Sequence, residues 1–265
     1  MESNQEMFDV VIIGAGIAGS STAYYCAKSG VRTLLLDQYD FLHANGSSGG
    51  QSRIVRTLYP SLEYTRTCMD AIKMWRHLES ATDTKLLSTS GGLDICRENS
   101  EVLNQLVSAA KRGNLQYELL NHEEINKKFP AYNISKGYMG VYTPDACIIH
   151  PTKAVNMFLE LGRKHGLTLR DNTKVLDIKN TNGMVMIQTQ NGLIKTPKCI
   201  IATGAWSKEI MSRCFNLNLN LIAKNILVTY WRSTNTSLGE YPYVLTHDIF
   251  DGKEALYSTP TMEYP

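Results

Sequence analysis

The stretch DVVIIGAGIAG, from Asp9 to Gly19, decides the fold of this chain of 265 residues. An apolar run rich in β-branched residues leads directly into a G-x-G-x-x-G pattern. A helix-length segment follows, and a second apolar run, from Thr33, ends at Asp37. This order predicts a strand, a tight turn, a helix and a second strand that closes with an acid, which is typical of a dinucleotide site.

Each part of this unit has a physical task. Gly14 permits the tight turn, Gly16 lets a pyrophosphate approach the backbone, and Gly19 lets the helix pack closely on the strand. The helix N-terminus offers free N–H groups to phosphates. Asp37 is placed to accept hydrogen bonds from ribose hydroxyls. The alternative interpretation is a glycine-rich turn in some other α/β protein.

Composition narrows the classes of function. The net charge is +2, with 27 Lys and Arg against 25 Asp and Glu, and 43% of the residues are hydrophobic. This balance indicates neither a nucleic-acid partner nor a charged membrane surface. No apolar run approaches the length of a transmembrane helix, and the acidic, polar N-terminus is unlike a secretory signal. The six cysteines form no CxxC pair, so we expect reduced thiols and no metal site.

Coarse patterns along the chain predict two interleaved domains. Helices are expected over residues 63–81, 101–112, 123–128 and 151–165. Short strands with Asn-Gly turns at 182–183 and 191–192 follow, then a strand and small-residue turn over 198–206, and strand character over 219–231. We therefore predict an α/β fold: a doubly wound, Rossmann-like domain interleaved with a mixed-sheet α+β substrate domain. The first is expected to comprise residues 1–84 and 145–217, and the second residues 85–144 and 218–265.

Four stretches carry a resemblance to a known family: residues 11–19, 45–56, 200–207 and 257–265. The second, with its G-S-x-x-G-x-S-R-x-x-R pattern, is the most specific. The chain resembles the FAD-dependent amine oxidases of the D-amino-acid oxidase superfamily, in particular the sarcosine oxidase and L-pipecolate oxidase group. The likeness covers residues 8–265.

The resemblance implies FAD as the cofactor and assigns the residues that bind it. The glycines of the opening turn would bind the pyrophosphate, Asp37 the ribose and the Val175 backbone the adenine. Part of the second stretch would lie along the flavin, and a second turn would close on the cofactor. The expected cofactor-binding residues are Gly14, Gly16, Gly19, Asp37, Ser47, Ser52, Arg53, Ile54, Val175, Ala202, Gly204 and Trp206.

The resemblance also names three catalytic candidates. Arg53 would sit close to the isoalloxazine ring, Arg56 would hold a substrate carboxylate, and Tyr257 would reach into the substrate pocket. The chemistry of arginine agrees with this, because its planar fork matches two carboxylate oxygens and its charge favours an anionic reduced flavin. The alternative is two solvated surface arginines. Tyr257 taken alone is more often a packed aromatic.

The implied activity is oxidation of a secondary amino acid, such as sarcosine or L-pipecolate, to an imine, with O2 reduced to H2O2. The expected partners are this small substrate and O2, and we expect a monomer with neither nucleic acid nor membrane as partner. Peroxisomal location is implied by the resemblance, although residues 263–265 form no targeting tripeptide; otherwise we expect a cytoplasmic protein.

Two other functions stay open at this point. The family continues past residue 265 with a flavin-tethering cysteine, a lysine thought to activate dioxygen and a Gly-Phe-Ser-Gly-His-Gly stretch, so this chain is interpreted as a fragment. It could then be a catalytically incompetent nucleotide-binding remnant. The opening turn and Asp37 also permit a nicotinamide-dependent dehydrogenase, but the arginine loop and the Ala-Thr-Gly-Ala-Trp turn speak against it.

Overall fold

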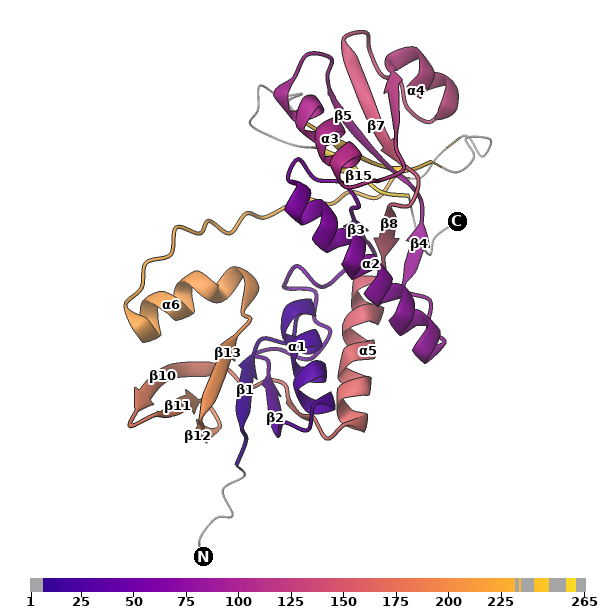
Figure 1. Ribbon diagram of the computed structural model, residues 1–265. Helices are drawn as coiled ribbons and strands as arrows, with labels where there is room; N and C mark the ends of the chain where they lie inside the picture. The colour runs from indigo at the N-terminus through magenta and orange to yellow at the C-terminus, as the bar shows by residue number, and fades with distance from the viewer. Residues whose placement is uncertain (1–6, 232–233, 235–240, 248–255, 261–265) are drawn as a thin grey trace, which may run out of the picture. The chain divides into compact units, whose positions relative to one another are not determined.

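The computed structural model describes residues 7–231, 234, 241–247 and 256–260. The chain forms two compact units (Figure 1): residues 1–50 with 151–228, and residues 51–150 with 229–265. Each unit has its own sheets and its own hydrophobic core.

A four-stranded parallel sheet forms the centre of the first unit, in the order β13–β1–β2–β9. Its strands are β1 (Val10–Ile13), β2 (Thr33–Leu36), β9 (Thr168–Arg170) and β13 (Lys198–Ile201). Every residue of β1 and β2 is buried, as expected for parallel strands covered on both faces. Because β1 pairs with both β2 and β13, the two sequence segments of this unit meet at the opening strand.

Different layers cover the two faces of this sheet. Helices α1 (Ile17–Lys28) and α5 (Pro151–Lys164) lie side by side on one face, where they share a core with Val10 and Ile12 (Figure 1). A three-stranded antiparallel sheet covers the other face and packs on Val11 and Ile13. Its strands are β10 (Val175–Thr181), β11 (Met184–Thr189) and β12 (Gly192–Thr196). Alternate residues of β1 thus serve two cores.

The turns predicted in this unit have simple local causes. Asn182 and Gly183 both have positive φ, +52° and +80°, as the tight hairpin between β10 and β11 requires. After β13, a 3-10 turn (Gly204–Trp206) leads into α6 (Ser207–Phe215). The strand, small-residue turn and helix expected from residue 198 onward are therefore confirmed.

The second unit holds a five-stranded mixed sheet in the order β15–β14–β5–β7–β6 and a three-stranded sheet in the order β3–β8–β4. Among the described strands of this unit, only the β14–β5 pair is parallel. The strands are β3 (Arg53–Val55), β4 (Leu87–Thr89), β5 (Gly92–Arg97), β6 (Glu118–Asn121), β7 (Tyr138–Thr143), β8 (Cys147–Ile149), β14 (Tyr243–Thr246) and β15 (Tyr257–Ser258). The helices are α2 (Leu62–Thr82), α3 (Glu101–Arg112) and α4 (His122–Lys128).

Side-chain caps fix where these helices begin. The Ser61 hydroxyl accepts a hydrogen bond from a first-turn N–H of α2, and Ser100 does the same for α3. Asn121 and Glu124 form a reciprocal capping box at the start of α4. The predicted α/β class, with a mixed-sheet second unit, is confirmed.

Two expectations differ from the structure. Residues 51–84 and 145–150, which we expected in the nucleotide domain, belong to the second unit because β3 pairs with β8. Residues 218–228 belong to the first unit.

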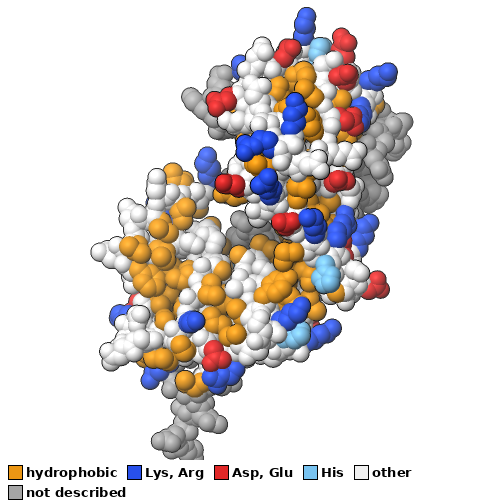
Figure 2. All heavy atoms as spheres, in the orientation of Figure 1, with side chains coloured by type: hydrophobic (Ala, Val, Ile, Leu, Met, Phe, Trp, Pro, Cys, Tyr) orange, Lys and Arg blue, Asp and Glu red, His pale blue; other side chains and the backbone are white. Residues whose placement is uncertain are grey.

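The strand predicted over residues 219–231 is wrong, because no described strand pairs with this segment. Its apolar side chains remain exposed, and Figure 2 shows many hydrophobic side chains on the surface of the region that contains α6. The exposed ones in this segment are Leu221, Ile222, Ile226, Leu227, Val228, Tyr230 and Trp231. Alternation and apolar character alone cannot make a strand without a hydrogen-bonded neighbour.

Candidate functional site

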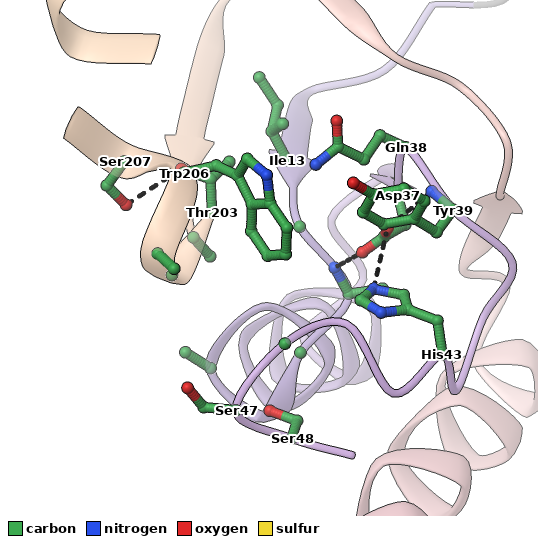
Figure 3. Close-up of a pocket in the computed structure, with 18 of the residues that line it drawn as sticks. Ile13, Asp37, Gln38, Tyr39, His43, Ser47, Ser48, Thr203, Trp206 and Ser207 are labelled. Atoms are coloured by element: carbon green, nitrogen blue, oxygen red, sulfur yellow. Dashed lines mark hydrogen bonds and ion pairs between the residues drawn. The ribbon is translucent and has the colours of Figure 1, made fainter. Parts of the chain in front are cut away.

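A cavity of about 330 Å³ opens in the first unit where the parallel strands end (Figure 3). Such a volume is within the range of small-molecule sites. Ligands of open α/β sheets bind at this edge, beyond the carboxyl ends of the strands. The predicted residues that line the cavity are Gly14, Gly16, Asp37, Ser47, Val175, Ala202, Gly204 and Trp206.

The three glycines of the opening turn have separate structural reasons. Gly14 has a φ of +102°, and a Cβ there would lie 2.4 Å from the carbonyl oxygen of Ala202. A Cβ on Gly19 would lie 1.7 Å from the carbonyl oxygen of Gly14, so the helix can approach the strand only at a glycine. A Cβ on Gly16 would meet only the Ser48 hydroxyl, at 3.1 Å. The fold therefore requires glycine at the first and third positions. At the second position, glycine keeps the cavity free of a side chain.

The N-terminus of α1 faces this cavity. Gly16 is its N-cap and brings no side chain to cap the free N–H groups. The Ile17 N–H donates to the Ser48 hydroxyl at 2.9 Å. The helix dipole and the remaining N–H groups therefore suit an anion at this position.

Asp37 lines the cavity beside the glycine turn. Its side chain is buried, and its two oxygens accept the Ala15 N–H at 2.7 Å and the Tyr39 N–H at 3.0 Å. The His43 Nε2 atom lies 3.4 Å from the same carboxylate. Because His43 Nδ1 accepts the Asn45 N–H, Nε2 carries the proton of the neutral ring and points at Asp37. The carboxylate is thus fixed in place, with lone pairs left for a diol.

Aromatic rings border the cavity between Asp37 and the second turn. Figure 3 shows Trp206 on one side and Tyr39 with His43 on the other. The ring centroids of Tyr39 and Trp206 are 5.7 Å apart, and those of Tyr39 and His43 are 4.9 Å apart. Sequence reasoning missed Tyr39, His43 and Ser48 as lining residues. The available signal was their position directly after Asp37 and within the polar loop.

The remaining candidates lie in the second unit. Ser52 makes a hydroxyl contact with Thr259 at 3.2 Å, and Ile54 packs against Ile148 and Tyr243. Arg53 is exposed, and its guanidinium donates to the Ser52 carbonyl.

Arg56 is the candidate that the structure holds most firmly. Its Nη2 donates to Asp94 Oδ1 at 2.7 Å; the Arg56 side chain is 14% exposed and the Asp94 side chain 0%. The guanidinium also stacks over the Tyr59 ring, 4.3 Å from its centroid. Sequence reasoning expected an arginine open to a substrate and missed Asp94, its buried partner.

Tyr257 and Arg56 converge on one sheet face of the second unit. Tyr257 in β15 pairs with Leu245 in β14, which pairs with Asp94 in β5. Residues in register across neighbouring strands point to the same face. Tyr257 therefore projects from the face that carries Asp94 and Arg56, although its own side chain is largely exposed.

The rings behind Arg56 lie in a poorly solvated environment. Burial raises the pKa of the Tyr59 hydroxyl, and burial raises that of Tyr243 well above its ordinary value. Both phenols are therefore neutral near pH 7. The positive charge of Arg56 is balanced in this region by Asp94.

The ADP half of FAD fits the cavity of the first unit. The uncapped helix N-terminus and the open space at Gly16 suit a pyrophosphate, Asp37 suits a ribose diol, and the aromatic border suits a planar base. In the described part of the chain, no group of His, Cys, Asp and Glu could hold a metal, and no helix is long and apolar enough to cross a membrane. None of the six cysteines forms a disulfide.

Comparisons with known proteins agree with this arrangement. The model of a family described as FAD dependent oxidoreductase (DAO) matches residues 9–263. A probable sarcosine oxidase of Arabidopsis thaliana is 32% identical over 99% of this chain and 65% of its own length. The peroxisomal sarcosine oxidase of Homo sapiens is 30% identical over 100% of this chain and 68% of its own length. The chain thus spans about two thirds of the length of these relatives.

Solved structures show a similar fold. The L-proline dehydrogenase of P. horikoshii superposes with a TM-score of 0.75 at 19% sequence identity, covering 91% of this chain and 65% of that one.

Proposed function

The chain belongs to the FAD dependent oxidoreductase (DAO) family, and we propose that the protein oxidises a secondary amino acid, such as sarcosine or L-pipecolate, to an imine. The observation that carries this proposal is the largely buried guanidinium of Arg56 on the sheet face that also carries Tyr257. The names of the relatives, two sarcosine oxidases at about 30% identity, support the same substrate class.

When bound, FAD would supply the two-electron chemistry of amine oxidation, with O2 as the final electron acceptor and H2O2 as its product. The residues of this chain bind the cofactor and orient the substrate. In this proposal Gly14, Gly16 and Gly19 form the pyrophosphate turn. Asp37 binds the ribose and the Val175 backbone meets the adenine.

Further residues complete the proposed cofactor site. Ser47 lines the cavity, as do the second-turn residues Ala202, Gly204 and Trp206. Ser52, Arg53 and Ile54 are proposed to run along the flavin, with the Arg53 charge beside the ring. The second unit then acts as the substrate domain.

Arg56 is proposed to bind the substrate carboxylate. Its Nη2 already donates to Asp94, so the guanidinium is held in one orientation before a substrate arrives. The fork keeps further N–H donors for a second carboxylate. Tyr257 contributes a ring and a hydroxyl to the same face. Orientation of this kind lowers the entropy cost of bringing the substrate carbon to the flavin.

The test is anaerobic reduction of the FAD-loaded, full-length protein. Sarcosine, L-pipecolate and other N-substituted amino acids are added one at a time, with the matching primary amino acids as controls. We expect at least one secondary amino acid to bleach the flavin absorption near 450 nm, and air to restore it with formation of H2O2. If no secondary amino acid reduces the flavin, the proposed substrate class is wrong.

We also propose a peroxisomal, monomeric protein. The name of the human relative supports the location. A fluorescent fusion that stays outside peroxisomes would contradict it, and light scattering of the purified protein tests the monomer.

A further inference from the structure

One carboxylate oxygen of Asp94 contacts two side-chain nitrogens that come from distant parts of the second unit. Its Oδ1 accepts from Arg56 Nη2 at 2.7 Å and lies 2.8 Å from His247 Nε2. The Asp94 side chain is fully buried, whereas the side chains of Arg56 and His247 stay 14% and 17% exposed. A buried carboxylate therefore lies beneath a guanidinium and an imidazole that both reach the surface of the sheet.

The position of His247 follows from the sheet register. Leu245 in β14 pairs with Asp94 in β5, and the His247 N–H donates to the Ile95 carbonyl at 2.8 Å. His247 is two residues beyond Leu245 and therefore projects to the face that carries Asp94. This is the face to which Tyr257 and the proposed carboxylate-binding Arg56 also belong.

The contact with Asp94 sets the proton on the imidazole. A carboxylate can only accept, so His247 Nε2 is the donor and Nδ1 of the neutral ring is a proton acceptor. A carboxylate on one ring nitrogen fixes the tautomer and stabilises the imidazolium that forms when the other nitrogen takes a proton. The pair therefore has the arrangement of a general base and its orienting acid.

Amine oxidation needs such a base. A secondary amino acid in water carries an ammonium group, and alkylammonium groups titrate near pH 10, so roughly one molecule in a thousand has a free lone pair at pH 7. Hydride loss from carbon to form an imine requires that lone pair. The carboxylate and nitrogen of an α-amino acid share one carbon, and the Arg56 guanidinium and the His247 ring are neighbours because Arg56 Nη2 and His247 Nε2 contact the same oxygen of Asp94.

We propose that His247 is the base that accepts the ammonium proton of the bound substrate, with Asp94 as its positioning residue. This rests on the proposed function. In the step, the substrate N–H bond breaks, its electron pair stays on nitrogen as the lone pair, and the proton forms a bond to His247 Nδ1. No electron leaves the substrate in this step. The hydride transfer that follows uses the neutral amine.

A purely structural role explains the arrangement less well. Asp94 Oδ2 is buried and has no hydrogen-bond partner among the described residues. A buried charge with half of its acceptors unused costs stability compared with an apolar side chain at the same place. A buried carboxylate at this position is explained if its negative charge stabilises the imidazolium that forms when His247 takes a proton.

Among the residues that the structure describes, the groups around His247 that can carry charge or titrate come from four segments. They are Asp94 on β5, Arg56 after β3, with Tyr59 beneath the guanidinium, Tyr243 on the same strand β14, and Tyr257 on β15. Burial raises the pKa of Tyr59 and Tyr243, so neither phenol titrates near neutral pH.

The experiment measures anaerobic flavin reduction by stopped flow over pH 6–10, with FAD-loaded wild-type protein and the variants His247→Asn, His247→Gln and Asp94→Asn. At pH 7 we expect the second-order rate constant of the two His247 variants to fall about 100-fold. The loss should shrink by about tenfold per pH unit and vanish near pH 9, where the free amine is about 100-fold more abundant than at pH 7. In Asp94→Asn the same rate constant should fall roughly tenfold at pH 7 and should also approach the wild-type value as the pH rises.

His77→Asn is the matched control, because His77 is an exposed histidine on α2 of the same unit. The rate constant of His77→Asn should depend on pH as that of the wild type does. Flavin absorption and the thermal midpoint confirm that each variant is folded. Acetate, which has a carboxylate and no amine, serves as a binding probe, and its Kd should change less than threefold in the His247 variants.

The outcomes separate the two proposals. A His247 variant with the wild-type pH profile, or with an equal loss at every pH, overturns the role as base. Wild-type protein that no secondary amino acid reduces overturns the proposed function instead.

Discussion

Replacing single glycines in the opening turn should separate cofactor binding from folding. In Gly16→Ala the new Cβ meets only the end of the Ser48 side chain, at 3.1 Å, and the backbone of Gly16 is extended. We expect the free energy of unfolding of the apoprotein to change by less than about 1 kcal/mol. The methyl group occupies the space where a pyrophosphate approaches. Loss of one or two charge-assisted hydrogen bonds should weaken FAD binding by about 2–4 kcal/mol, or roughly 30- to 700-fold in Kd.

Gly19→Ala should mainly lower the stability of the apoprotein. Its Cβ would lie 1.7 Å from the Gly14 carbonyl oxygen, so α1 must move away from β1. Such overpacking costs about 1–3 kcal/mol or more of apoprotein stability.

Urea unfolding of apoprotein and quenching of FAD fluorescence measure the two effects, with Ser29→Ala at the exposed far end of α1 as control. Wild-type FAD affinity in Gly16→Ala would show that the pyrophosphate does not approach this glycine, and a Gly19→Ala protein as stable as the wild type would show that α1 can pack on β1 without a glycine there.

Three further predictions follow from the same geometry. Asp37→Asn should raise the Kd for FAD at least tenfold, because an amide replaces the carboxylate that accepts the Ala15 and Tyr39 N–H groups; titration of the apoprotein with FAD measures it, and an unchanged Kd would contradict the ribose assignment. Arg56→Lys should raise KM for the amino acid by about 10-fold or more with a smaller effect on kcat, because a lysine cannot form the bidentate fork; an equal KM in steady-state assays would argue against carboxylate binding there. Burial raises the pKa of Cys199 to about 12, so its thiol should stay protonated in the folded protein and be alkylated at pH 8 at least about 100-fold more slowly than in urea; mass spectrometry follows the label, and equal rates would show that this thiol is not protected.

The first unit was largely predictable because its information is local. The strand, glycine turn, helix, strand and acid follow one another within residues 9–37, and each has a residue pattern of its own. The second turn at Gly204 repeats that logic. What the pattern could not show is how the loop folds back, which brings the Ser48 hydroxyl to the N–H of Ile17.

The second unit was harder because its decisive contacts are long-range. Arg56 and Asp94 are 38 positions apart, and Asp94 and His247 are 153 apart. Neither residue pair has a sequence pattern: the pairing of β14 with β5 brings His247 to Asp94, and Arg56 reaches Asp94 from the segment after β3. The predicted strand over residues 219–231 failed for a related reason: strand character is visible in sequence, but a partner strand is not.

The most direct test of the central claim is the binding of FAD to the cavity of the first unit. Purified full-length apoprotein is titrated with FAD by calorimetry, alone and in the presence of ADP, which carries only the half of the cofactor that this cavity is proposed to hold. We predict one FAD per chain and a Kd that rises with ADP concentration as expected for direct competition. Folded protein that takes up no FAD, or takes it up without hindrance from ADP, would contradict the account.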